Sequence, residues 1–131
     1  FVADAIGRRA YLFFTFLGSL ATTALTYGWV TTLDGLLISA CINGFFTLGC
    51  AYSWMAIYPA ELFTSSVRAS AAAFIFNAAR LVAWVFPIVA GSLIQTFGSV
   101  SRAAMTLGSV YLVGLVVPWF LPETRGKPLP E

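Results

Sequence analysis

Residues 70–97 of this chain read SAAAFIFNAARLVAWVFPIVAGSLIQTF and contain a single charged side chain, Arg80. A membrane-spanning helix needs about 20 consecutive, mostly apolar residues, and this stretch exceeds that length. Three further stretches are as apolar and contain no charged side chain: 10–30, 35–58 and 103–121. Because lipid cannot hydrogen-bond exposed backbone groups, a helix is the expected form of each stretch. The sequence therefore predicts an all-α membrane protein with four transmembrane helices.

The composition of the whole chain also indicates a lipid environment. Of the 131 residues, 60% are hydrophobic and only 9% are charged, whereas soluble domains contain about 25% charged residues. The chain has no histidine and no acidic residue within the four stretches, and Cys41 and Cys50 would lie on opposite faces of one helix. We therefore expect no enzymatic activity, no metal or other cofactor and no nucleic-acid partner.

Two kinds of local signal refine the helix boundaries. Pro87 and Pro118 lie within apolar stretches, where proline removes a backbone donor and is expected to kink or loosen the helix. Asp34 follows the turn after the first stretch and is predicted to cap the second helix.

The basic residues between the apolar stretches predict the orientation of the chain. If both ends and the loop 59–69 lie on one side of the membrane, that side carries five basic residues and the other side carries only Arg102. The five are Arg8, Arg9, Arg68, Arg125 and Lys127. Since cytoplasmic loops are enriched in arginine and lysine, both ends and this loop are expected to be cytoplasmic.

Three short charged segments flank the apolar stretches. Residues 4–9 read DAIGRR, residues 58–63 read YPAELF and are followed by Arg68, and residues 122–126 read PETRG. In order and in the number of helices between them, these segments resemble motifs of the major facilitator superfamily, in particular its sugar-porter and metabolite:proton symporter branches. Thr64 stands where that family has proline, a change that leaves the charges in place.

This resemblance implies that residues 1–131 are the C-terminal part of a transporter with a twelve-helix fold. The four stretches would be helices nine to twelve, residues 122–131 would be a cytoplasmic tail, and the missing N-terminal helices of the same protein would be partners. A start within a polar loop also favours a fragment of a longer protein. The expected location is a bacterial inner membrane, with several passes through the bilayer.

The resemblance further implies a charge network at the cytoplasmic ends of the helices. Its expected members are Asp4, Gly7, Arg8, Arg9, Glu61, Arg68, Glu123 and Arg125. The planar guanidinium of arginine binds carboxylates through two parallel hydrogen bonds, so the three acids would face the four arginines. In the family such a cluster helps to hold the cytoplasmic side closed. The alternative is that these are solvated charges that only set the orientation.

Arg80 is the leading candidate for a substrate-binding residue. A charged side chain near mid-membrane is costly, so Arg80 must reach a wet cavity, a ligand or an acidic partner in another helix. Asn77, Phe76 and Trp84 share its helix face, and this set would suit a carboxylate on an apolar body. Residues 76–80 also resemble the Tyr/Phe-Asn-x-Gly-Arg pattern of organic-acid symporters. Structural pairing of Arg80 with an acid outside this chain remains the alternative.

A second candidate is Asn43, an amide in the middle of the second stretch, which could face the substrate cavity or serve helix packing. Together these residues predict secondary active transport of a small solute by alternating access. The resemblance favours a proton-coupled organic anion, with sugars as the next choice. The other class of function that we consider is a self-contained four-helix accessory protein or small exporter subunit.

Overall fold

The computed structural model describes residues 2–131, and this part of the chain is helical with no strand. A short helix α1 (Val2–Ile6) precedes the long helix α2 (Arg8–Gly28). The later elements are α3 (Leu33–Gly44), the π-helical segment η1 (Phe45–Cys50), α4 (Ala51–Leu62), α5 (Arg68–Ala83), α6 (Phe86–Phe97), α7 (Val100–Gly108), α8 (Val110–Val116) and the 3-10 turn η2 (Val117–Phe120).

These elements form four helical rods that are long and apolar enough to cross a membrane. The rods cover Arg8–Gly28, Leu33–Leu62, Arg68–Phe97 and Val100–Phe120. They confirm the predicted all-α membrane architecture. The second and third rods are longer than expected, because α4 continues through Pro59 to Leu62 and α5 begins at Arg68. The predicted loop 59–69 is correspondingly shorter.

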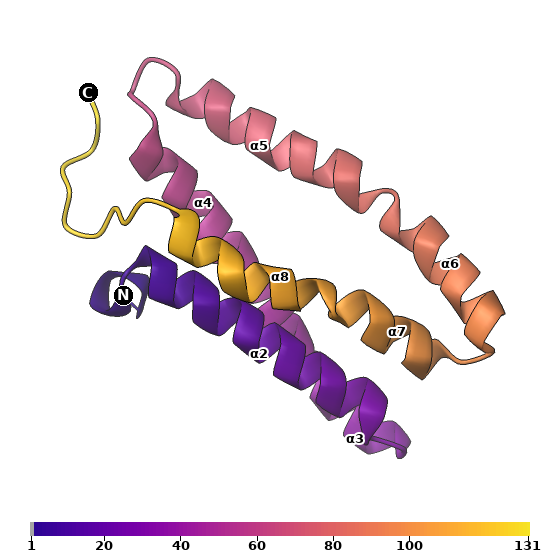
Figure 1. Cartoon of the computed structure of the whole chain (residues 1–131). Coiled ribbons are helices and arrows are strands. Elements are labelled where there is room, and N and C mark those ends of the chain that lie inside the picture. The colour runs from indigo at the N-terminus through magenta and orange to yellow at the C-terminus, as the bar shows by residue number, and fades with distance from the viewer. Residues whose placement is uncertain (1) are drawn as a thin grey trace.

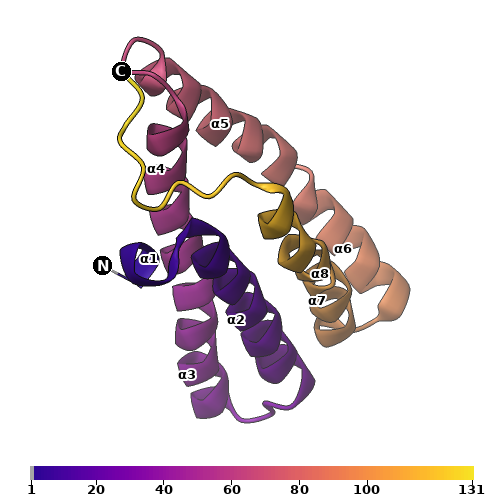
Figure 2. The ribbon, with the colours of Figure 1, turned by 60° about the vertical axis from the view of Figure 1, so that its left-hand side comes forward.

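The four rods run side by side, and both described ends of the chain lie at the same end of the bundle (Figure 1). Helix α1, the connection between α4 and α5 and the C-terminal tail gather there. Helix α2 is central, since it packs against α3 and η1 on one side and against α7 and α8 on the other. The third rod is peripheral: α5 packs on α4, and α6 packs on α7 (Figure 2).

Two glycines allow α2 to approach its neighbours closely. A Cβ atom on Gly114 of α8 would lie 2.4 Å from Cδ1 of Phe16, and one on Gly18 of α2 would lie 2.3 Å from Cδ1 of Phe46. Each phenyl ring therefore rests on bare backbone of the neighbouring helix. Small residues serve this purpose widely in membrane proteins, where close van der Waals packing drives helix association.

Both intramembrane prolines disturb their helices, and the effect at Pro87 is a break where the sequence predicts only a kink. Helix α5 ends at Ala83, four residues before Pro87, and α6 begins at Phe86. The position of the break follows from the proline ring, which clashes with the carbonyl of the residue four positions earlier. Pro118 lies within the 3-10 turn η2. The π-helical segment η1 contains no proline, and the sequence gives no signal for it.

The predicted cap of the second rod is wrong. Thr32, not Asp34, is the capping residue, because its Oγ1 accepts a hydrogen bond from the backbone N–H of Gly35 at 3.3 Å. Asp34 is the second residue of α3 and lies in its first turn. There its carboxylate is near the positive end of the helix dipole.

Candidate functional site

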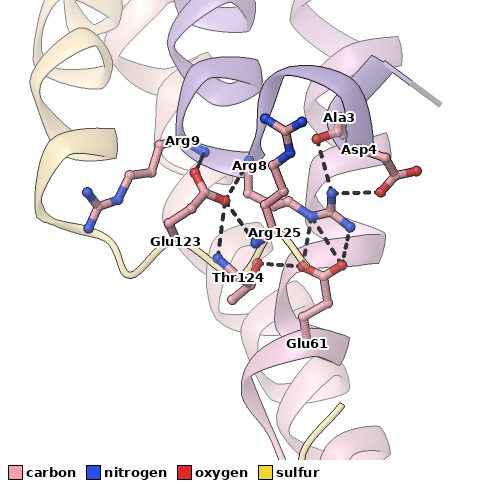
Figure 3. Close-up of polar contacts among 8 residues, drawn as sticks. All are labelled: Ala3, Asp4, Arg8, Arg9, Glu61, Glu123, Thr124 and Arg125. Atoms are coloured by element: carbon pink, nitrogen blue, oxygen red, sulfur yellow. Dashed lines mark hydrogen bonds and ion pairs between the residues drawn. The ribbon is translucent and has the colours of Figure 1, made fainter. Parts of the chain in front are cut away.

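Arg8 lies at the centre of a charged cluster at the end of the bundle where α1, α4 and the tail meet (Figure 3). Its Nε donates to both carboxylate oxygens of Glu61, at 3.1 and 2.9 Å, and its Nη2 donates to the same carboxylate. Its Nη1 contacts Asp4 Oδ1 at 2.6 Å and donates to the carbonyl of Ala3 at 3.0 Å. Only 10% of the Arg8 side chain and 16% of the Glu61 side chain are exposed. This guanidinium therefore joins three segments of the chain.

Glu123 caps the N-terminus of α2 from the other end of the sequence. Its Oε1 accepts from the backbone N–H of Arg8 at 2.9 Å, and its Oε2 accepts from that of Arg9 at 3.2 Å. Gly7 makes this approach possible, since a Cβ there would lie 3.0 Å from Glu123 Oε2. Gly7 also has a φ of +95°, which side chains other than glycine rarely adopt. The glycine of the DAIGRR segment is thus favoured chiefly by its backbone conformation, and the tight approach of the Glu123 side chain adds to that preference.

The basic side chains of the cluster differ in what they bind. Arg8 pairs with acids, whereas Nε of Arg9 donates to the carbonyl of Leu121. Arg68 donates to the carbonyls of Phe63 and Pro130 and not to Glu61. Arg125 contributes its backbone N–H to Glu123, and among residues 2–131 its guanidinium has no ion-pair partner. One of the four arginines therefore makes the carboxylate pairs.

Two members of the cluster were not singled out from the sequence. Thr124 donates its hydroxyl to Glu61 Oε2, and Tyr58, which is 3% exposed, donates its hydroxyl to the carbonyl of Pro122 at 2.7 Å. Both residues belong to the segments YPAELF and PETRG, so membership in these segments was the available signal. Together they fasten the start of the tail to α4.

Local hydrogen bonds shift the titration of two acids outside the membrane-spanning rods. Hydrogen bonding to Arg8 lowers the pKa of Asp4. Burial alone would raise the pKa of Glu123, but the backbone N–H groups of Arg8, Arg9, Arg125 and Thr124 outweigh burial and lower that pKa. Both carboxylates are therefore held in the ionised form at neutral pH.

The residues predicted around Arg80 do not all face the same way. Arg80 is exposed near the middle of the third rod, and no hydrogen bond or ion pair reaches its guanidinium from residues 2–131. Asn77 and Trp84 are also exposed, and Asn77 donates to the carbonyl of Ala73 in its own helix at 2.8 Å. Phe76 instead turns toward α4 and stacks on Tyr52, with ring centroids 6.3 Å apart. Arg80, Asn77 and Trp84 thus present an open polar and aromatic surface.

Asn43 lies apart from Arg80 and joins two rods. Its Nδ2 donates to Thr23 Oγ1 at 2.8 Å and to Thr22 Oγ1 at 3.3 Å, so it links α3 to α2. It also lines a cavity of about 410 Å³ with Thr47, Tyr27 and Tyr111. The structure therefore shows a packing role for Asn43 and places it at the edge of a cavity, while its role in binding a substrate stays a prediction.

Comparison with known proteins identifies the class of protein. The family profile described as sugar (and other) transporter matches residues 1–131. The chain is 30% identical over 129 residues to a cis,cis-muconate transport protein of Acinetobacter baylyi, covering 98% of this chain and 30% of that protein. It is 30% identical over 132 residues to a proline/betaine transporter of Escherichia coli, covering 98% of this chain and 26% of that protein. It is also 29% identical over 127 residues to solute carrier family 22 member 16 of Bos taurus, covering 96% of this chain and 22% of that protein.

No solved structure gives a significant match. The four apolar rods and the matching family profile define an integral membrane protein of the major facilitator superfamily. Within it, this chain belongs to the sugar (and other) transporter family. The family and the three relatives are named as transporters or solute carriers, which confirms that the chain is not an enzyme. The chain spans about a quarter of the length of these relatives.

Proposed function

We propose that this chain is the C-terminal part of a secondary transporter that carries a small solute by alternating access. It would supply helices nine to twelve, and the remaining helices of the same protein would complete the fold. The family membership and the order of the three charged segments support this assignment. In such transporters the substrate binds near the middle of the membrane, between two halves that rock around it.

The observation that carries the proposal is the placement of Arg80. Its guanidinium lies in the middle of a rod that is long enough to cross the membrane, on a surface that residues 2–131 leave open. Arginine does not lose its proton in proteins, so this charge needs an anionic or hydrated counterpart. A carboxylate substrate would supply one, with Asn77 and Trp84 beside it.

The relatives support a small polar or anionic solute. One is named for cis,cis-muconate, an organic anion, and another for proline and betaine. We therefore favour an organic anion over a sugar. If transport is coupled to protons, the titrating acid must lie near the ends of the rods or outside this chain, because Arg80 is the only charged side chain near mid-membrane in this sequence.

The charged cluster would act as a latch on the cytoplasmic face. Arg8, Glu61 and Glu123 join α2, α4 and the tail, and their contacts would break when the cavity opens to that side. Five basic residues at this end against Arg102 at the other support a cytoplasmic location for both ends. A bacterial inner membrane is the proposed setting.

Uptake by the full-length transporter tests the role of Arg80. The variants Arg80→Lys and Arg80→Ala are compared with Arg102→Ala, which removes a charge from the opposite end of the bundle. For a labelled carboxylate, Arg80→Ala is expected to raise KM at least tenfold, the factor corresponding to the loss of about 1.5–3 kcal/mol from a hydrogen bond to a charged group. The KM of Arg80→Lys is expected to lie between those of the parent protein and Arg80→Ala, since lysine keeps the positive charge but lacks the planar guanidinium.

Two results would contradict this role. Unchanged carboxylate uptake in both Arg80 variants, at normal surface expression, would exclude Arg80 from an anion site. Equal loss in Arg102→Ala would show that net charge, not position, determines uptake.

A further inference from the structure

Arg9 is separated from the ion cluster although it adjoins Arg8 in the sequence. Figure 3 shows its guanidinium pointing away from Glu123, Arg8 and Glu61. Its Nε donates to the carbonyl of Leu121, and no hydrogen bond or ion pair reaches its two terminal nitrogens from residues 2–131. Arg9 therefore presents an unpaired positive charge on the outside of the cluster.

An apolar cavity of about 320 Å³ begins beside this charge. It lies between α2 and η2 and is lined by Phe13, Phe14, Pro118 and Trp119, with Arg9 and Glu123 at its charged end. Phe13 and Trp119 hold their rings edge to face, with centroids 6.1 Å apart, and Trp119 and Phe14 are 67% and 55% exposed. The cavity is thus an open apolar groove with the positive charge of Arg9 at one end.

The negative charge of Glu123 does not cancel Arg9 at this position. Its two oxygens accept hydrogen bonds from the backbone N–H groups of Arg8, Arg9, Thr124 and Arg125. The carboxylate keeps its charge, but its oxygens are already engaged by the helix end and the tail, and no ion pair joins it to the Arg9 guanidinium among the described residues. The charge left to face outward is that of the Arg9 guanidinium.

From this geometry we infer that Arg9 and the apolar groove between Phe13 and Trp119 bind an anionic phospholipid. The phosphate contacts the terminal nitrogens of Arg9, and one acyl chain lies in the groove. Charge complementarity and place in the membrane support this occupant. Arg9 is at the end of a membrane-crossing rod, where headgroups lie, and basic pockets between membrane helices bind anionic headgroups. Exposed tryptophan is typical of the same interfacial layer.

Native mass spectrometry of the purified full-length transporter tests this inference with phosphatidylglycerol as the probe. Arg9→Gln is expected to weaken phosphatidylglycerol binding about fivefold, the factor that corresponds to about 1 kcal/mol for a basic residue at a membrane surface. Arg9→Lys should retain most of the binding. Arg125→Gln, at the same end of the bundle, and Arg102→Gln, at the other end, are the matched controls and should bind as the parent protein does.

Two further measurements separate the headgroup from the acyl chain. Glycerol phosphate, which has the charge but no chains, should not displace the lipid, and Phe13→Ser should weaken lipid binding with Arg9 intact. Binding by the unaltered protein should fall as salt is raised. This last measurement does not depend on the folding of any variant.

Several outcomes would overturn the inference. If Arg9→Gln binds phosphatidylglycerol as the parent does, the groove is covered by another part of the transporter or holds no anionic lipid. Equal loss in Arg125→Gln would show general surface attraction, and displacement by glycerol phosphate would show a site for a soluble anion. Phosphatidylglycerol binding that does not change with salt would show that the charge of Arg9 does not contribute to it.

Discussion

Within residues 2–131, the first and fourth rods are packed against neighbouring helices, whereas the third rod is left largely uncovered. Within the most apolar part of each rod, 28% of positions in Arg8–Gly28 and 22% in Val100–Phe120 are buried, against 0% in Arg68–Phe97. The third and fourth rods are almost equally apolar, with mean hydropathies of 1.8 and 1.7, so hydropathy does not explain their difference in burial. The difference lies in close helix approach, which the first and fourth rods achieve through bare glycine backbone under phenyl rings. The third rod leaves Arg80, its one charged side chain near mid-membrane, with no hydrogen-bond or ion-pair partner for the guanidinium among residues 2–131.

The largest effect that we expect comes from filling a glycine in the packed region. Gly114→Leu should destabilise the protein by about 3 kcal/mol, because overpacking a close contact costs about 1–3 kcal/mol and the Phe16 ring already fills the space. Gly91→Leu in α6 is the matched control, since no atom lies within 4 Å of a Cβ there. Thermal unfolding of the purified protein in detergent measures both. Equal losses would show that the third rod is packed as tightly as the fourth.

Loss of an arginine should distinguish the same two regions. Arg8→Ala should lower the free energy of unfolding by about 2 kcal/mol, because hydrogen bonds to charged groups contribute about 1.5–3 kcal/mol and Glu61 would be left unpaired. Arg80→Ala should leave it unchanged, since Arg80 has no partner within residues 2–131.

The exchange Arg8→Glu with Glu61→Arg provides the control for the first half of this prediction. It should recover part of the stability and of the transport activity that each single reversal removes. If the double variant is no better than the single ones, these residues are solvated charges and not a latch.

A smaller difference is expected for the two intramembrane asparagines. Asn43→Ala removes two hydrogen bonds between rods and should destabilise the protein by about 1 kcal/mol, within the range measured for polar contacts between membrane helices. Asn77→Ala removes only a bond to its own helix and should have no measurable effect on unfolding. The same Asn77 variant should reduce carboxylate uptake if it lies beside Arg80 in the substrate site. Similar unfolding temperatures for both variants would show that the hydrogen bonds of Asn43 between rods contribute no more to stability than the bond of Asn77 within its own helix.

The smallest effect concerns pH and the tail. The pKa of Glu123 is lower in the folded protein than its usual value of 4.5. The folded state therefore binds fewer protons, and the contribution of Glu123 is complete above about pH 4.5 and is lost as the pH falls through the folded pKa. The unfolding temperature should decline in that acidic range, and Glu123→Gln should make the decline shallower. If the unfolding temperature of Glu123→Gln declines as steeply as that of the parent protein, the decline is caused by other acids.

The sequence predicts the number and the approximate limits of the rods because each span must be apolar over a fixed length. It also predicts a disturbance of the helix near Pro87, since the proline ring clashes with the carbonyl four residues earlier. It does not predict η1, where no residue type marks the change from an α-helix to a π-helix. It brings the charged segments together but does not assign Glu61 to Arg8. That pairing depends on how α2 and α4 cross, whereas Arg68 is closer in sequence and yet binds carbonyls.

The cap that Glu123 places on α2 has a consequence for the synthesis of the protein. The capping carboxylate is 115 residues later in the chain than the first N–H group that it accepts from. At about 5–20 residues per second, the ribosome needs roughly 6–23 seconds to make that interval. During this time the backbone N–H groups of Arg8 and Arg9 at the start of α2 lack the Glu123 carboxylate that caps them in the folded protein. The end of the bundle therefore matures only when translation has passed residue 123, and a nascent chain halted earlier would offer this helix end to chaperones or the insertion machinery.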